Sequence, residues 1–178
     1  MAEIKSAVEL AMERTKGLRL SHEEKEKMQE EEIQSRAVGL VNRYLEVDFH
    51  LREVEKELAK VDPSQRKHLE QLFIQNLTEA LNVDRDNDLI LQGLETFRPA
   101  SAWTVKKIKD LIQKYQDRKK DEFRKTEADL AAKLERLGIS GSAVHPRVEA
   151  SPEWEEAVAK FKPGLEEELK KLKKGILS

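Results

Sequence analysis

Five side chains in the stretch DRDNDLILQGLE, residues 84–95, have the spacing of ligands in a calcium-binding EF-hand loop. They are Asp84, Asp86, Asp88, Gln92 and Glu95. Leu89, however, occupies the position where that loop requires glycine for its sharp turn. We therefore expect the acidic residues to lie at the start of a helix, whose dipole favours carboxylates there. Calcium binding is the alternative interpretation.

Histidine offers a second kind of metal chemistry. The four histidines are His22, His50, His68 and His145, and no two are four residues apart, the spacing at which a helix holds zinc. Glu46 and His50 share a helical face, but the Glu-x-x-His motifs of di-iron bundles are missing. We predict no metal ligands and no cofactor, and we expect His50 to lie partly exposed at a helix interface.

A candidate for nucleophilic catalysis is the stretch RLGISGSAVHPRVEASPEW, residues 136–154. Ser140 and Ser142 lie near His145, but no G-x-S-x-G turn and no phosphate-binding GK[ST] ending are present. The absence of Cys excludes thiol nucleophiles, thiolate zinc sites and disulfides. We predict no catalytic residues and no enzyme activity. Gly138 is expected to end a helix and residues 138–151 to form an exposed connector, with a partner-binding loop as the alternative.

The composition predicts that helices position these residues. Of the 178 residues, 38% are charged and 38% hydrophobic, with only seven Gly and five Pro. This usage is typical of long helices and coiled coils. We predict an all-α fold of long amphipathic helices, packed as an antiparallel helical bundle or coiled coil over residues 1–137. A C-terminal helical segment, residues 152–178, is expected to be interrupted at Pro163 and Gly164.

The most regular pattern is an apolar seam that follows a Ser21–Glu24 capping box. Its members are spaced alternately four and three residues apart: Ile33, Ala37, Leu40, Tyr44, Val47, Leu51, Val54, Leu58 and Val61. They predict one coiled-coil helix from about residue 21 to 61, too long for a single core and so in need of a long partner helix. The partner is a second copy or the long helix predicted at about 101–137. We favour a homo-oligomer, because the charged stretch QDRKKDE, residues 116–122, interrupts the internal partner.

Shorter apolar stripes predict further helices. One is formed by Ile4, Val8, Ala11, Met12 and Thr15, and Gly17 would end that helix. Others are expected after Asp62 and Pro63 and over about residues 85–97. The last helix should start at Ser151 and Pro152 and dock through residues at spacings of four and three, namely Trp154, Val158 and Phe161.

One basic stretch departs from the overall net charge of −2. Residues 105–125 hold nine Lys or Arg against four Asp or Glu: the basic members are Lys106, Lys107, Lys109, Lys114, Arg118, Lys119, Lys120, Arg124 and Lys125. A basic helical face can bind nucleic-acid phosphates or an acidic protein surface. The other interpretation is a solvated face, or one paired with the Glu-rich residues 22–32 of the same chain. We favour the second interpretation.

No apolar run approaches the roughly 20 residues of a membrane span, and the first stretch, MAEIKSAVELAMERTK, is charged and amphipathic and lacks the continuous apolar region of a leader peptide. We therefore expect a cytoplasmic protein without a membrane partner. The patterns together predict a non-enzymatic interaction or assembly protein, a scaffold or adaptor with protein partners, that acts through its coiled-coil surface. Binding of nucleic acid or an acidic partner through residues 105–125 is the alternative.

The two ends of the chain carry a family resemblance. The stretches EIKSAVELAMERTK, LGISGSAVHP and PEW resemble a family of uncharacterised helical bacterial proteins, over about a fifth of the chain. The resemblance implies a bacterial cytosolic protein and no assigned activity, so it transfers no catalytic residues. If GISGSAV is a signature of that family, the connector is a loop with a defined docking place.

Overall fold

The computed structural model describes residues 21–46, 49–139, 141 and 144–177. This part of the chain contains α-helices and two short 3-10 helices, without a strand, so the all-α prediction is confirmed. The helices are α2 (His22–Tyr44), α3 (Leu51–Ala59), α4 (Pro63–Ala80), α5 (Asp88–Phe97), α6 (Ala102–Arg136) and α7 (Pro152–Leu177). The predicted N-terminal helix, Ser140 and Ser142 lie outside the described residues. None of the described helices is both long and apolar enough to cross a membrane.

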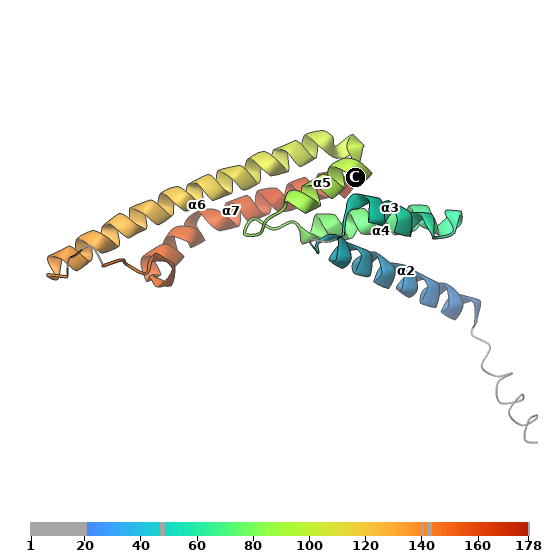
Figure 1. The fold of residues 1–178 in the computed structure, drawn as a ribbon, viewed down its shortest axis with the longest axis horizontal. Coiled ribbons are helices and arrows are strands. Elements are labelled where there is room, and N and C mark those ends of the chain that lie inside the picture. The colour runs from blue at the N-terminus through green and yellow to red at the C-terminus, as the bar shows by residue number, and fades with distance from the viewer. Residues whose placement is uncertain (1–20, 47–48, 140, 142–143, 178) are drawn as a thin grey trace, which may run out of the picture.

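The helices form two regions (Figure 1). The body, residues 21–115 and 161–177, surrounds α4, which packs against α2, α3, α5 and α7. The arm, residues 116–160, comprises the second part of α6, the connector and the first part of α7, and it extends beyond the body as an antiparallel hairpin. With 35 residues, α6 is about 52 Å long at 1.5 Å per residue, whereas α4 measures only about 27 Å. The body can therefore cover only the first half of α6.

Aromatic rings and one glycine close the core of the body. The ring of Phe73 meets those of Tyr44 and Phe97 edge-on, at centroid distances of 5.9 and 5.3 Å. A Cβ atom added to Gly93 of α5 would lie 2.9 Å from Leu77 Cδ1 and 3.0 Å from Tyr44 Cε1. The close packing of α5 on α2 and α4 therefore requires glycine, although glycine inside a helix costs about 1 kcal/mol relative to alanine.

The predicted continuous helix from about residue 21 to 61 is wrong. Helix α2 ends at Tyr44, and α3 begins at Leu51. At this new start the His50 backbone N–H donates to Glu53 Oε2 at 3.2 Å. An unbroken helix over 22–59 would be about 57 Å long, twice the length of α4, on which both halves of the seam pack. The break allows both halves to bury their apolar residues on this one short helix.

The predicted interruption of the last helix at Pro163 is also wrong, because α7 is continuous through it. Proline lacks the N–H that would bond to the carbonyl one turn earlier, so that carbonyl has no hydrogen-bond donor within the helix. Pro163 and Gly164 lie on the exposed face of α7, where water can hydrate the carbonyl. On the opposite face Phe161, Leu165 and Leu169 are buried at intervals of four residues, and their burial holds the helix together.

The end of α6 follows the sequence pattern closely. Gly138 adopts a positive φ of 77°. Its N–H donates to the Glu135 carbonyl at 2.9 Å, and the Ile139 N–H donates to the Leu134 carbonyl at 3.0 Å. This pair of bonds is a Schellman motif, which satisfies carbonyl groups at the end of the helix.

The connector after it is less exposed than predicted. Val148 and Ser151 are buried, although most of the other described residues between 138 and 151 are exposed. The Ser151 side chain accepts a hydrogen bond from the Trp154 N–H at 3.3 Å and so begins α7. Of the predicted docking residues, Trp154 and Phe161 are buried and Val158 is half-buried. Trp154 meets Phe123 of α6 edge-on at 5.5 Å and joins the two helices of the arm.

Candidate functional site

The apolar seam lies inside the body of one chain. Six members belong to the hydrophobic core around α4: Ala37, Leu40, Tyr44, Val54, Leu58 and Val61. Ile33 and Leu51 are half-buried against this core, and Val47 lies outside the described residues. Because helices of the same chain cover most of the seam, an assembly of several copies cannot use the seam as a continuous coiled-coil surface.

The nine basic residues of 105–125 are distributed around α6, because successive helical residues rotate by about 100°. Five of them have partners: Lys109 pairs with Glu95, Lys119 with Asp84 and Lys125 with Glu122, while Lys107 and Arg118 lie over the rings of Trp103 and Phe161. The other four are exposed and make no ion pair among the described residues: Lys106, Lys114, Lys120 and Arg124. Three exposed aspartates, Asp110, Asp117 and Asp121, alternate with these four. The outer face of α6 therefore carries mixed charge.

The Glu-rich start of α2 does not neutralise this stretch. Within the described residues, the ion pairs of residues 22–32 are His22 with Glu26 at 3.3 Å and Glu30 with His68 of α4 at 2.9 Å. Neither pair involves α6. The predicted pairing of the two charged segments within one chain is thus not what the ion pairs show.

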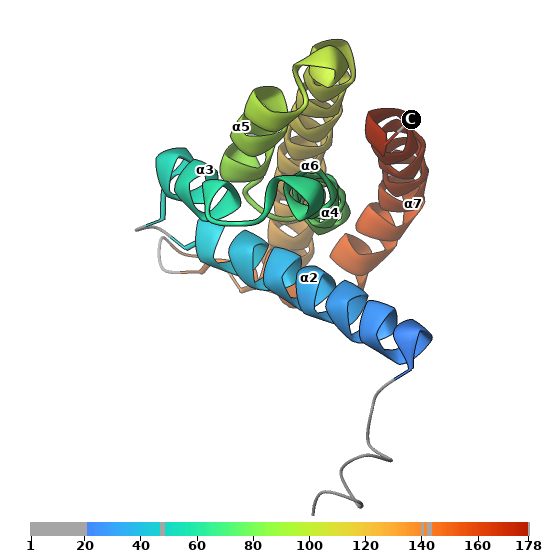
Figure 2. The same ribbon diagram turned by 90° about the vertical axis from the view of Figure 1, so that its right-hand side faces the viewer.

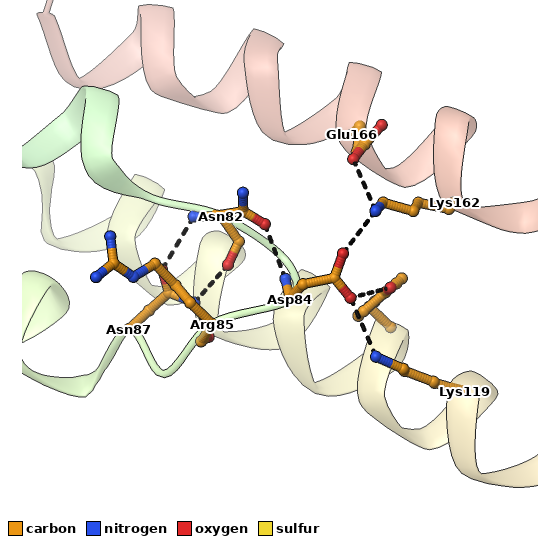
Figure 3. A network of polar contacts seen from close by, with 8 residues as sticks. Asn82, Asp84, Arg85, Asn87, Lys119, Lys162 and Glu166 are labelled. Carbon is orange, nitrogen blue, oxygen red and sulfur yellow. Dashed lines mark hydrogen bonds and ion pairs between the residues drawn. The ribbon is translucent and has the colours of Figure 1, made fainter. Parts of the chain in front are cut away.

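The loop between α4 and α5 is built by two asparagines (Figure 3). Asn87 is 3% exposed. Its side-chain N–H groups donate to the carbonyls of Asn82 and Arg85, both at 2.7 Å, and its Oδ1 accepts from the Asn82 N–H at 3.1 Å. Asn82 Oδ1 in turn accepts from the Asp84 N–H at 2.9 Å. These bonds fix the loop and hold the Asp84 side chain toward α6 and α7.

The Asp84 carboxylate joins this loop to both helices at the root of the arm (Figure 3). Its Oδ1 accepts from the Tyr115 hydroxyl at 2.5 Å and from Lys119 Nζ at 3.1 Å, both on α6. Its Oδ2 lies 2.6 Å from Lys162 Nζ on α7, and that ammonium lies 3.6 Å from Glu166. We refer to Asp84, Tyr115, Lys119 and Lys162 as the Asp84 cluster. It connects three segments that are distant in the sequence.

The electrostatics of the Asp84 cluster fix its protonation. Burial alone would raise the pKa of Asp84, but hydrogen bonds from Lys162, Tyr115 and Lys119 outweigh it and lower that pKa to about 2. Burial and the hydrogen bond to Asp84 raise the pKa of Tyr115 above its ordinary value of 10. The hydrogen bond to Asp84 also raises the pKa of Lys162. Since these pKa values move away from neutrality, the cluster is suited to a structural clamp and poorly suited to proton transfer.

A cleft of about 720 Å³ opens beside the cluster, between residues 83–88 and α6. Two of the calcium positions in its wall are already engaged, because Asp84 binds the cluster and Asp86 accepts from the Asp88 N–H at 2.9 Å. Glu95, outside the cleft, accepts from Lys109 at 2.6 Å. In the part of the chain that the structure describes, no group of three or more acidic or histidine side chains is arranged for a metal ion. The geometry favours the helix-start interpretation, with Asp88 in the first turn of α5.

The end of the arm exposes three apolar side chains. Leu137 is 74% exposed, Ile139 49% and Val144 36%. Leu130 and Leu134 precede them on α6 and are half-buried. Single exposed apolar residues are common, whereas several at one projecting end are a candidate surface for binding. We call Leu137, Ile139 and Val144 the arm tip.

The sequence patterns did not reveal the Asp84 cluster. Tyr115 and Lys119 are 31 and 35 residues from Asp84 along the chain, and Lys162 is farther still. The one signal was local: Lys119 lies in the charged stretch QDRKKDE, residues 116–122, which interrupts the apolar face of α6. Its partner could be found only from the fold.

No protein-family model, curated protein or solved structure matches the chain. The resemblance at its two ends therefore places it in no family with a known activity. Its function is therefore inferred from the chemistry of its own surfaces.

Proposed function

We propose that this protein is a non-enzymatic helical interaction protein, an adaptor or assembly factor, whose arm contacts a protein partner. The observation that carries the proposal is the arm tip, where Leu137, Ile139 and Val144 are exposed at the end of a projecting hairpin. Apolar side chains that served only the fold of this chain would lie toward its core. At the arm tip the described residues leave them exposed, so they are available to another molecule.

The way the arm is held supports this role. At its root, Asp84 binds both α6 and α7. Farther out, the rings of Phe123 and Trp154 pack edge-on, and Lys133 Nζ lies 2.5 Å from Glu153 Oε1. A hairpin fixed at two places presents its tip with little conformational freedom, which lowers the entropic cost of docking.

The chemistry of the cleft supports a non-enzymatic role as well. A general acid or base at neutral pH needs a pKa near 7 and access to a substrate. The pKa of Asp84 is about 2, and that of Tyr115 is raised above 10. Both groups also bind each other, so neither is available to a substrate.

Recovery of a partner from the cells that produce the protein tests the proposal. The test variant replaces Leu137, Ile139 and Val144 by Ser in the tagged full-length chain. A matched control replaces three other exposed apolar residues by Ser, namely Met28, Val38 and Leu177. We expect the wild type and the control to retain the same partner and the arm-tip variant to lose it, with unchanged helical circular dichroism. Equal recovery with the arm-tip variant would refute the proposal.

Binding of nucleic acid or an acidic partner through α6 is the second candidate. It is supported by four exposed basic side chains that form no ion pair with another described residue, Lys106, Lys114, Lys120 and Arg124. The aspartates between them weaken a field that would attract phosphates.

A cytoplasmic location and a bacterial origin are part of the proposed function as a helical interaction protein. They are supported by the absence of Cys and by the resemblance at the two ends.

A further inference from the structure

A groove runs along the body between α3 and α5. It consists of two hollows of about 630 and 360 Å³ that share Arg52 in their walls. Its apolar lining comes from both helices and from the segment before α3: Phe49, Leu51, Leu58, Ala59, Leu89 and Phe97. Both helices pack on α4, so the groove lies over the centre of the body.

The lining of this groove is incompletely covered within one chain. Phe49, Leu51 and Phe97 pack on the core from one side and remain half-buried, and Leu89 is 40% exposed. Charged side chains of both signs flank the apolar lining: Arg52, Lys56 and Arg66 with Glu55 and Glu70. An apolar groove with a charged rim fits the apolar face of an amphipathic helix.

The sequence predicts such a helix outside the described residues. Ile4, Val8, Met12 and their neighbours predict an apolar stripe on a helix of about 14 residues, or about 21 Å. The adjoining first half of α2 offers it no apolar surface, because residues 22–32 are exposed and only Met28 among them is apolar. The stripe therefore needs a partner other than α2.

The direction of α2 decides which groove the stripe can reach. Figures 1 and 2 both show the start of α2 projecting from the body, and in Figure 2 this end lies across α4 from α3 and α5. The Ser21–Glu24 capping box, with bonds of 3.1 and 2.7 Å, fixes the helix start there. Ser21, to which residues 1–20 are joined, thus lies on the side of the body away from the groove of its own chain.

We propose that residues 1–20 of one copy place their apolar stripe in the α3–α5 groove of a second copy, and that the exchange is reciprocal. The result is a two-fold symmetric dimer with two equivalent contacts. This inference rests on the proposed assembly function and names its partner as a second copy, but it does not use the arm tip. It also keeps a homo-oligomer, now through a groove whose walls contain Tyr44, Leu51 and Leu58 of the seam but none of its other members.

Light scattering on the full-length chain and three single variants tests the dimer. Val8→Asp places a charge in the stripe, and Leu89→Asp places one in the groove. Val38→Asp is the matched control, because Val38 is 42% exposed, like Leu89, but lies on α2 outside the groove. We expect the wild type and Val38→Asp to have the mass of two chains. Val8→Asp and Leu89→Asp should have half that mass and unchanged circular dichroism.

A fluorescein-labelled peptide of residues 1–20, titrated into the full-length Val8→Asp chain, identifies the occupied surface. We expect saturable binding that weakens at least tenfold when Leu89→Asp is added.

A wild type with the mass of one chain overturns the dimer. Peptide binding to Val8→Asp would then mean that the groove holds the segment of its own chain. A dimer lost only in the Leu137, Ile139 and Val144 variant overturns the groove but supports the arm. A wild-type monomer leaves the partner-recovery test of the arm unaffected.

Discussion

The body and the arm are stabilised by different means. In the body, α2 to α5 and the first half of α6 share one continuous apolar core, in which Phe73 and Leu77 are fully buried. In the arm, Thr126 is the one residue of α6 that is buried. In the arm, α6 and α7 are joined by the Phe123–Trp154 ring contact and by an ion pair between Lys133 and Glu153. The body thus folds around its own core, whereas the arm leaves apolar side chains exposed at its tip.

Truncation of an aromatic ring in each region gives the largest contrast. Phe73→Ala should lower the free energy of unfolding by about 3–5 kcal/mol, because it opens a cavity between two other rings. Phe123→Ala removes a half-buried ring and should cost about 1–2 kcal/mol. Urea denaturation followed by circular dichroism measures both. Equal losses would contradict the distinction between a packed body and a lightly packed arm.

Overpacking the body should have the next largest effect. Gly93→Ala places a methyl group against Leu77 and Tyr44, both of which are fully buried and have little room to shift. The expected loss is about 1–3 kcal/mol, after the better helix propensity of alanine is counted. Gly164→Ala is the control, because a Cβ there meets no atom within 4 Å. The control should be neutral or slightly stabilising, and an equal loss in both variants would rule out the close approach at α5.

The Asp84 cluster, where body and arm meet, should respond to acid. Asp84→Asn removes the charge that Lys119 and Lys162 bind, and we expect a loss of about 1–2 kcal/mol at neutral pH, since water screens this partly exposed carboxylate. The pKa of Asp84 in the folded state, about 2, is below its ordinary value of 3.8. Its contribution is therefore complete above about pH 5 and falls as the pH is lowered toward 2.

Chemical denaturation between pH 2 and pH 7 measures this contribution. The difference in stability between the wild type and Asp84→Asn should shrink as the pH falls through this range. A difference that is independent of pH would show that the charge of Asp84 does not clamp the arm. Tyr115→Phe removes one hydrogen bond and keeps the charge, so it should retain most of the pH dependence.

Local signals made much of the fold predictable. Helices begin where the sequence places a cap or a proline, as at Ser21, Asp62–Pro63 and Ser151–Pro152, because each signal acts within one helical turn. The break between α2 and α3 could not be predicted in this way, since the apolar spacing continues unchanged from Tyr44 to Leu51. The length of α4 determines it, and that is a property of the packed molecule.

The candidate sites also differ in whether a local sequence signal or only the packed fold reveals them. Gly138 and the exposed residues after it were recognisable from composition, because a helix end is a local event. The Asp84 cluster depends on three segments meeting in space, and only the misplaced charge of Lys119 gave a sign of it. The basic stretch shows the reverse case: its charges are neighbours in the sequence, but the helix distributes them around its axis, so the sequence suggested a basic face that the structure does not have.

The outer face of α6 runs along both body and arm, and it should give the smallest effect. Four exposed basic residues alternate there with three aspartates, so few phosphates can be neutralised at once. We expect duplex DNA or RNA to be retarded only at about 50 mM salt and to be free by about 200 mM. A variant with Lys106, Lys114, Lys120 and Arg124 replaced by Gln should change this little at physiological salt. Retardation that persists at 200 mM salt in the wild type and is lost in the variant would instead establish nucleic-acid binding by this face.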